Sequence, residues 1–186
     1  MRKIVEYPQK ILRKKAKVIK KADKIFLEEA NQLKEILEKS ENGAGLAGPQ
    51  IGVSKRMFAI KNEDKVRVFL NPLIKKKIGK RVYPIIEKED ERKEYFLEGC
   101  LSFPNFFGRV KRWLEIEVEW QEVRGGALIK KNIVLKSFEA IVWQHERDHL
   151  DGILFIDHIR KDGGKFFKME AGVMKKWKLK KGFNLI

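Results

Sequence analysis

Cysteine and histidine are scarce in this chain, which has one cysteine and three histidines among 186 residues. A single cysteine excludes an internal disulfide and is typical of a protein of the reducing cytoplasm. No apolar run approaches the roughly 18 residues that a membrane helix requires. The first residues, MRKIVEYPQKILRKKAK, lack the apolar segment of a signal peptide. We therefore expect a cytoplasmic protein that does not contact a membrane.

The remaining composition is that of a folded chain with unevenly distributed charge. Hydrophobic residues make up 43% and charged residues 37%, which argues against disorder, and 186 residues suit one domain. We expect a single domain over residues 1–186 with a basic tail from about residue 160. Residues 1–24 hold ten Lys/Arg and two acidic residues, and residues 160–186 hold nine and two, so these ends carry +8 and +7 of the net charge of +16.

Basic ends on a near-neutral body predict contact with a polyanion such as RNA, through phosphates and without sequence-specific recognition of bases. The alternative is that the lysines only keep a small protein soluble, because charge alone specifies no partner.

Periodicity predicts both helices and strands. Asp23 is placed to cap an amphipathic helix that ends near Glu41. Its apolar face consists of Phe26, Ala30, Leu33 and Leu37. RMFAI and VRVFL predict two strands joined around residues 62–65, and strand-like pieces follow in LIKKKI and RVYPII. EGCLSFPNFFG, residues 98–108, predicts a loop or edge structure.

The clearest strand is WLEIEVEWQ, residues 113–121, because apolar and polar residues alternate along it. Its predicted buried face consists of Leu114, Ile116, Val118 and Trp120. LIKKNIVL, residues 128–135, predicts the partner strand, and Ser137 is placed to cap a following helix. KFFKMEAGVMKKW predicts a hairpin that turns at Ala171 and Gly172.

Two of the three histidines stand four residues apart in AIVWQHERDHLDG, residues 140–152. On a helix, His145 and His149 share one face, and the apolar residues Phe138, Ile141 and Val142 place that face toward the core. Two neutral imidazoles from one helix suit a divalent transition metal, and Glu146 is placed to move a proton of a water molecule there. The alternative is a coincidental spacing of two buried histidines. His158 has no such neighbours and is expected to be an ordinary surface or hydrogen-bonded histidine.

A hydrolytic metal site usually has three protein ligands and an open position, so two imidazoles are not enough. Asp151, Asp157 and His158 lie downstream but too close on the same helix or just beyond it to be compelling. Cys100 is the better candidate for a third ligand, because turn residues flank it. A lone cysteine can equally be a small buried apolar residue.

Three segments in order, GAGLAGPQ at 43–50, EGCLS at 98–102 and QHERDHLDG at 144–152, resemble the signature motifs of the peptide deformylase family. The early segment YPQKILRKKAK is also similar to that family, and the resemblance extends from about Tyr7 to Ile159. It implies an α+β fold with antiparallel or mixed β-sheets around a central metal-binding helix. It also implies removal of the formyl group from the N-terminal methionine of newly synthesised polypeptides.

The resemblance implies roles for particular residues. Cys100, His145 and His149 would be metal ligands, Glu146 the general acid/base, and the Gln50 amide and Leu101 backbone N–H donors to the formyl oxygen. The implied metal is one divalent ion, usually iron(II), with zinc, nickel or cobalt as alternatives. The predicted substrate-binding residues are Ala44, Gly45, Phe96, Glu98, Gly99, Phe138, Ile141 and Val142. The partners are then formyl-methionyl nascent peptides and, through the basic ends, the ribosome.

Some residues depart from the family pattern. Gly48 stands where alanine is usual, which predicts a looser strip at GAGLAGPQ. Ala44 replaces a branched residue, which predicts a wider pocket for methionine. Phe106 and Phe107 occupy positions that are often polar or arginine, and the segment after Ile159 does not resemble the long C-terminal helix of some members.

Two other functions share part of this pattern. A metallopeptidase that cuts internal peptide bonds would take a third ligand downstream, where none is compelling, and an assay on formylated and unformylated Met-peptides separates the two enzymes. An RNA- or ribosome-binding module with a structural zinc would need a fourth protein ligand, but no second cysteine exists and Glu146 would have no role.

Overall fold

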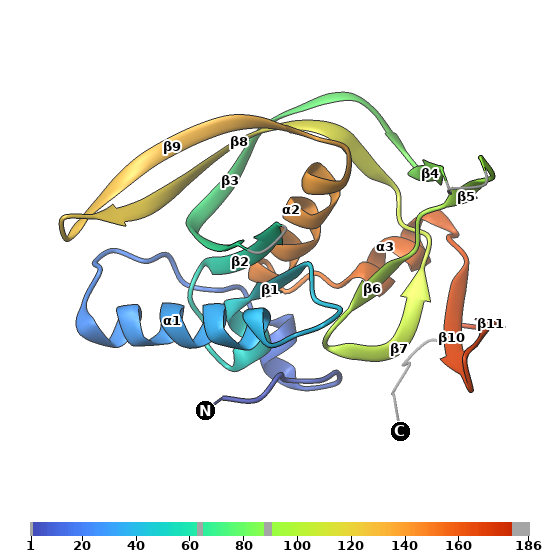
Figure 1. Cartoon of the computed structure of the whole chain (residues 1–186), viewed down its shortest axis with the longest axis horizontal. Helices are drawn as coiled ribbons and strands as arrows, with labels where there is room; N and C mark the ends of the chain where they lie inside the picture. Colours follow the sequence, from blue (N-terminus) through green and yellow to red (C-terminus); the bar gives the residue numbers. More distant parts are fainter. Residues whose placement is uncertain (1, 63–64, 88–90, 180–186) are drawn as a thin grey trace.

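The computed structural model describes residues 2–62, 65–87 and 91–179 (Figure 1). Its helices are α1 (Lys24–Glu38), α2 (Ser137–Leu150) and α3 (Phe155–Asp162), with the short 3₁₀ turns η1 (Lys10–Arg13) and η2 (Gly48–Ile51). Among these described residues, no helix is both long and apolar enough to cross a membrane.

The strands form three sheets. The largest has the order β1 (Gly45–Ala47), β2 (Met57–Asn62), β3 (Lys65–Val82), β8 (Arg112–Arg124) and β9 (Ala127–Lys136). The second has the order β11 (Val173–Trp177), β10 (Phe166–Glu170), β7 (Phe103–Gly108) and β6 (Glu98–Cys100). The third pairs β4 (Ile85–Glu87) with β5 (Lys93–Tyr95). The named strands pair antiparallel, and an isolated bridge between Lys17 and Lys55 is parallel.

The first predicted helix is confirmed. The side chain of Asp23 accepts a hydrogen bond of 2.8 Å from the backbone N–H of Phe26, and Phe26, Leu33 and Leu37 are buried. The helix ends at Glu38, three residues earlier than predicted. This helix packs against β2 and β3 and covers one side of the large sheet (Figure 1).

Strands β3, β8 and β9 form a long arch of the large sheet (Figure 1). One prediction for this arch is confirmed and another is corrected. Strands β8 and β9 pair as predicted, and Ile116 and Val118 are fully buried, but Leu114 is 39% exposed. LIKKKI does not form a separate strand, because β3 runs without interruption through it to Val82 and accommodates its irregularities as register shifts against β8. Of the segment RVYPII, residues 81–86, only Ile85 and Ile86 lie in a separate strand, β4.

Helix α2 lies between the arch and the short strands β1 and β2 (Figure 1). The ring of Trp143 packs edge-on against Phe58, Phe69 and Trp120, which fixes the helix in the core. Ser137 is not the N-cap. The cap is Lys136, while Ser137 is the first helical residue and has a left-handed φ of 49°.

The C-terminal hairpin is confirmed, because β10 and β11 pair and turn at Ala171 and Gly172, with φ of 48° and 78°. β10 also pairs with β7, so the hairpin extends the sheet that begins at β6. Residues 98–108, predicted as loop or edge structure, form β6 and β7, and β6 is the edge of that sheet.

Candidate functional site

Helix α2 carries the two histidines and the glutamate of the predicted site as buried side chains. His145, Glu146 and His149 are 9%, 3% and 1% exposed, so the predicted inward orientation of both imidazoles is what the structure has. Burial, which disfavours a charged imidazole, lowers the pKa of His149 well below its ordinary value. A neutral imidazole is the form that binds a metal.

Cys100, at the end of β6, brings a thiol to the two imidazoles. Its Sγ lies 3.3 Å from His149 Nε2, and one potential ligand atom from each of the three residues lies within 4.8 Å of the others. One sulfur and two nitrogen donors with short mutual distances fit a divalent transition metal. The three residues that the sequence suggested as ligands are therefore brought together.

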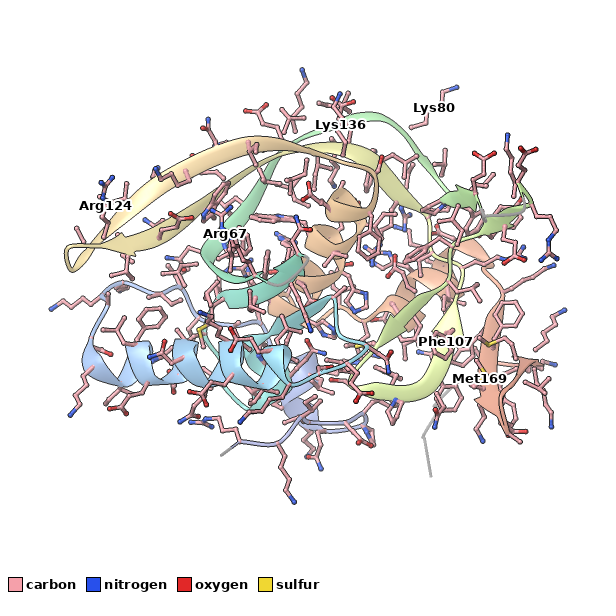
Figure 2. All side chains as sticks on the ribbon, viewed as in Figure 1. Arg67, Lys80, Phe107, Arg124, Lys136 and Met169 are labelled. Atoms are coloured by element: carbon pink, nitrogen blue, oxygen red, sulfur yellow. The ribbon has the colours of Figure 1, made fainter. Side chains whose placement is uncertain are left out.

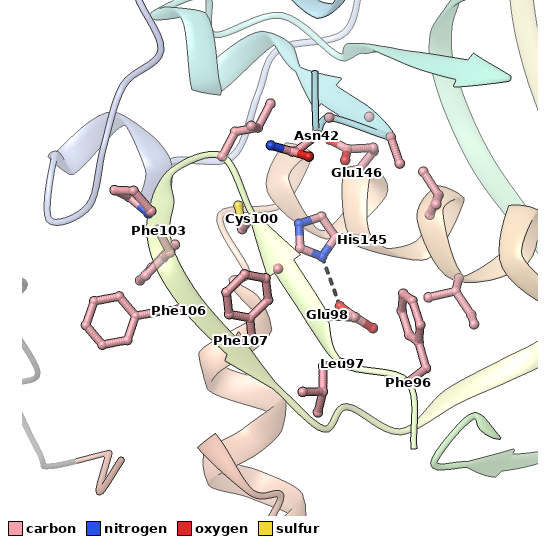
Figure 3. A pocket seen from close by; sticks show the side chains of 18 of the residues that line it. Asn42, Phe96, Leu97, Glu98, Cys100, Phe103, Phe106, Phe107, His145 and Glu146 are labelled. Atoms are coloured by element: carbon pink, nitrogen blue, oxygen red, sulfur yellow. Dashed lines mark hydrogen bonds and ion pairs between the residues drawn. The ribbon is translucent and has the colours of Figure 1, made fainter. Parts of the chain in front are cut away.

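Glu98 supports His145 from the side opposite the cysteine. Its Oε2 lies 2.9 Å from His145 Nδ1 (Figure 3). Arg112 donates to both oxygens of this carboxylate, at 2.7 and 2.9 Å. Burial would raise the pKa of Glu98, but the charge and hydrogen bonds of Arg112, together with His145, lower it to about 2. The resulting carboxylate favours the His145 tautomer with hydrogen on Nδ1, which leaves Nε2 as the donor atom.

Glu146 is held against the backbone of β1. A Cβ atom at Gly45 would lie 2.5 Å from Glu146 Oε1, so only glycine allows this approach. Glu146 Oε2 is buried and has no hydrogen-bond partner among the described residues. Burial raises the pKa of Glu146 to about 7, which lets this carboxyl exchange a proton near neutral pH.

Gln50, in the turn η2, approaches the same place from the other side. Its Oε1 accepts a hydrogen bond from the backbone N–H of Ala47, which fixes the amide orientation. Its Nε2 lies 3.2 Å from Ser102 Oγ and 3.5 Å from Cys100 Sγ. The amide N–H groups therefore point toward the Ser102 hydroxyl and the Cys100 thiol.

A cavity of about 660 Å³ opens in front of these groups (Figure 3). The predicted site residues that line it are Ala44, Gly45, Gln50, Phe96, Glu98, Gly99, Cys100, Leu101, Phe138, Ile141, Val142, His145 and Glu146. His149 lies behind the lining, next to Cys100. Phe138 is 51% exposed and its ring meets Phe96 edge-on, so it stands at the rim and not in the core as its helical position had suggested.

Two departures from the family pattern have structural consequences. Gly48 is buried, and a Cβ there would lie 2.8 Å from the Lys55 carbonyl oxygen, so this end of the strip is packed too closely for alanine and is not loosened. Phe106 and Phe107 both line the cavity, and Phe107 covers Gly99, where a Cβ would lie 2.9 Å from the ring.

Arg112 is a residue of the site that the sequence patterns above did not predict. It is 3% exposed and its charge is neutralised by Glu98 and Asp148. A signal was present, because Arg112 has the same parity along its strand as the buried Ile116 and Val118. A charged residue at an inward position requires buried partners, so the alternation that predicts the strand also predicts an ion pair.

A thiol, two imidazoles and a buried carboxylate beside one cavity fit the class of metal-dependent hydrolases, which usually have three protein ligands. The family model for polypeptide deformylase matches residues 1–164. Two similar proteins are the peptide deformylases of Desulforudis audaxviator and Pseudothermotoga lettingae. The first is 36% identical over 83% of this chain and 90% of its own length. The second is 40% identical over 80% of this chain and 77% of its own length.

Solved structures of peptide deformylases have a similar fold. The crystal structure of the peptide deformylase from Thermotoga maritima superimposes with a TM-score of 0.70 and 32% identity, covering 85% of this chain and 97% of that one. The Legionella pneumophila peptide deformylase gives a TM-score of 0.70, 31% identity and 85% coverage of each chain. This chain belongs to the peptide deformylase family.

Proposed function

We propose that this protein is a metal-dependent hydrolase that removes the N-formyl group from the N-terminal methionine of newly synthesised polypeptides. The observation that carries the proposal is the convergence of Cys100, His145 and His149 with Glu146 on one cavity, in a chain of the peptide deformylase family. Residues 1–186 act in this proposal as one catalytic domain. The cytoplasmic location expected from the single cysteine stays a prediction.

Cys100, His145 and His149 would hold one divalent ion, so that α2 is the metal-binding helix at the centre of the fold. We infer that this ion is iron(II) in the cell, with zinc, nickel or cobalt as alternatives that the same donors accept. When bound, such an ion acts as a Lewis acid and lowers the pKa of a coordinated water.

The protein groups then move protons and stabilise charge. Glu146 takes a proton from the attacking water and delivers it to the nitrogen of the leaving amine, a role that suits a carboxyl with a pKa of about 7. Negative charge develops on the formyl oxygen as the water adds. The Gln50 amide and the Leu101 backbone N–H donate hydrogen bonds to that oxygen.

The methionine side chain enters the apolar part of the cavity. Ala44, Phe96, Phe138, Ile141 and Val142 supply its wall. Gly45 and Gly99 let the peptide backbone approach closely, because neither carries a side chain. Both oxygens of Glu98 are occupied by Arg112 and His145, so we assign its carboxylate to orienting His145 and only its backbone to the cavity wall.

Turnover of formyl-Met-Ala-Ser by protein purified without oxygen, with metal analysis of the same sample, tests the proposal. We expect formate release that depends on the metal, and no cleavage of unformylated Met-peptides. Formyl-Asp and formyl-Lys peptides should react more slowly, because an unpaired charge is costly in an apolar pocket. Metal-loaded protein that releases no formate, or that cuts internal peptide bonds instead, would overturn the proposal. Equal rates for the Met, Asp and Lys peptides would reject only the pocket.

A further inference from the structure

A continuous series of hydrogen-bonded groups leads away from His145, beginning at Glu98. Its inner part is His145, Glu98, Arg112 and Asp148. Arg112 Nη1 donates to Asp148 Oδ2 at 2.6 Å while its other nitrogens bind Glu98. The guanidinium is therefore held between two carboxylates, one of which orients His145.

The outer part of the series is His158, Arg81 and Asp162. His158 Nε2 lies 2.8 Å from Asp148 Oδ2, and His158 Nδ1 lies 2.9 Å from Arg81 Nη2. Arg81 in turn pairs with Asp162 at 2.8 Å and donates from Nε to the Lys111 carbonyl oxygen at 2.8 Å. The third histidine is thus part of this network and not an isolated surface residue.

The contacts of His158 determine which ring nitrogen carries hydrogen. An arginine N–H can only donate, so Nδ1, facing Arg81, must accept. Nε2 then carries the hydrogen and donates to Asp148, whose carboxylate can only accept. The ring thus accepts a hydrogen bond from Arg81 and donates one to Asp148. A glutamine amide can also accept and donate in this way, whereas a leucine side chain can do neither.

The series joins four elements whose relative placement sets the site. Arg81 lies at the end of β3, Arg112 at the start of β8, Asp148 on α2 and His158 on α3. His158 directly contacts Asp148, the sequence neighbour of His149. It reaches His145 through three further contacts, Asp148–Arg112, Arg112–Glu98 and Glu98–His145. A hydrophobic cluster with Phe155 and Ile159 already packs α3, so the polar series is not needed merely to attach that helix.

We propose that Arg81 and His158 are positioning residues of the metal site, which hold Asp148 and Arg112 in place and through them the orientation of His145. The inference rests on the proposed metal site. Outer contacts of metal-bound histidines typically change metal affinity by about 10- to 100-fold, and His158 is further removed than such a contact. We therefore expect roughly threefold to tenfold effects from its loss.

The test compares His158→Leu, His158→Gln and Arg81→Met with Arg67→Met as the matched control. Arg67 forms an ion pair with Glu122 on the arch, remote from the site. Each protein is loaded with nickel, and release of the metal to a chelator is timed. Melting temperature is measured alongside, and kcat and KM for formyl-Met-Ala-Ser are determined on the same preparations.

His158→Leu should release nickel roughly threefold to tenfold faster and lower kcat more than it changes KM, whereas His158→Gln should stay within about twofold of the unmodified protein. Arg81→Met should also speed release, and the double variant with His158→Leu should be no faster than the faster single variant. Equal release from His158→Leu and Arg67→Met would overturn the inference, as would equal behaviour of the Leu and Gln variants or multiplicative effects in the double variant.

If His158→Leu does not fold, Arg81→Met and His158→Gln still decide the question. Fast release from Arg81→Met with a retained melting temperature would support the inference, and release as slow as in Arg67→Met would reject it. Failure of the proposed function is recognised separately, because the unmodified protein would then bind nickel but release no formate.

Discussion

Cys100 supplies the single thiol of the chain, so its replacement tests the proposed donor set at the scale of one atom. We expect Cys100→Ser to lose most of its bound metal during gel filtration, because a hard hydroxyl replaces a soft thiolate. Metal per chain by atomic absorption is the measurement. Ser102→Ala, two residues along and not a proposed ligand, is the control and should keep its metal. Full occupancy and activity in Cys100→Ser would remove this residue from the site.

Glu146 is expected to act in the reaction and not in the fold. Glu146→Ala should keep metal and melting temperature but lose turnover by about 100-fold or more, the usual contribution of a positioned proton carrier. Glu139→Ala on the same helix is the control, because Glu139 is exposed and bonds only to Asn62 among the described contacts. Near-normal kcat in metal-loaded Glu146→Ala would contradict the role.

A substitution at Gly45 tests the role of the Glu146 carboxylate by displacing it. In Gly45→Ala the new methyl group would lie within 3 Å of three Glu146 side-chain atoms, so the carboxylate must move. We expect the variant to retain its metal and to have a kcat lowered by about 10- to 100-fold, a smaller loss than that of Glu146→Ala. An unchanged kcat would mean that Glu146 works from more than one position.

The proposed ligands could be found from sequence to different degrees. His145 and His149 are local, since helical geometry alone places them on one face. Cys100 comes from β6 and meets them only through tertiary structure, so spacing could not exclude a buried structural cysteine. Arg112 went unnoticed because its strand was identified from its apolar residues, although its inward parity was readable.

At the scale of elements, α1 and β8 were predictable because each is half-buried and therefore amphipathic. The continuity of β3 was not predictable, because its middle carries lysines and bulges where the strand leaves the core, so neither a helical nor a strand period is present there. The start of α2 was misplaced because a backbone bend at Ser137, and not its hydroxyl, begins the helix.

The cap of α1 gives an element-scale prediction. Asp23→Ala removes the acceptor for the Phe26 N–H, and we expect a loss of about 1 kcal/mol in the free energy of unfolding. Asp23→Asn, which retains an acceptor, should recover most of it. Urea denaturation of the three proteins is the measurement. Equal midpoints for Asp23→Ala and the unmodified chain would show that packing of Phe26 alone fixes this end of the helix.

At the scale of the whole molecule, the basic ends are built into the fold. The N-terminal residues Leu12, Ala16 and Ile19 are buried, and Phe166 of β10 is 2% exposed. What was expected as a basic tail from residue 160 is, up to residue 179, the end of α3 and a hairpin of the second sheet. The arch also bears lysines, and Lys80 and Lys136 project outward from it (Figure 2).

If formylated chains are the substrate, they emerge beside ribosomal RNA, and the basic ends are suited to hold the enzyme there. Deleting residues 165–186 would remove buried Phe166, so charge reversal is the cleaner change. Lys175, Lys176 and Lys178 on and beside β11 are exposed, whereas Lys180 and Lys181 lie outside the described residues. The matched control reverses as many exposed lysines of the arch, namely Lys75, Lys76, Lys80, Lys130 and Lys131.

We expect the unmodified protein to sediment with ribosomes at low salt and to be released at about 0.3 M KCl, because phosphate contacts release counterions and weaken steeply with salt. Reversal of the five C-terminal lysines to glutamate should reduce this binding far more than reversal of the five arch lysines, although both change the net charge equally. Turnover of a short formyl-peptide should change little in either variant, since none of the described lysines among them lines the cavity. Equal loss of sedimentation in the two variants would mean that total charge and not a docking surface governs the contact. Absence of binding at low salt would leave the basic ends as a device for solubility.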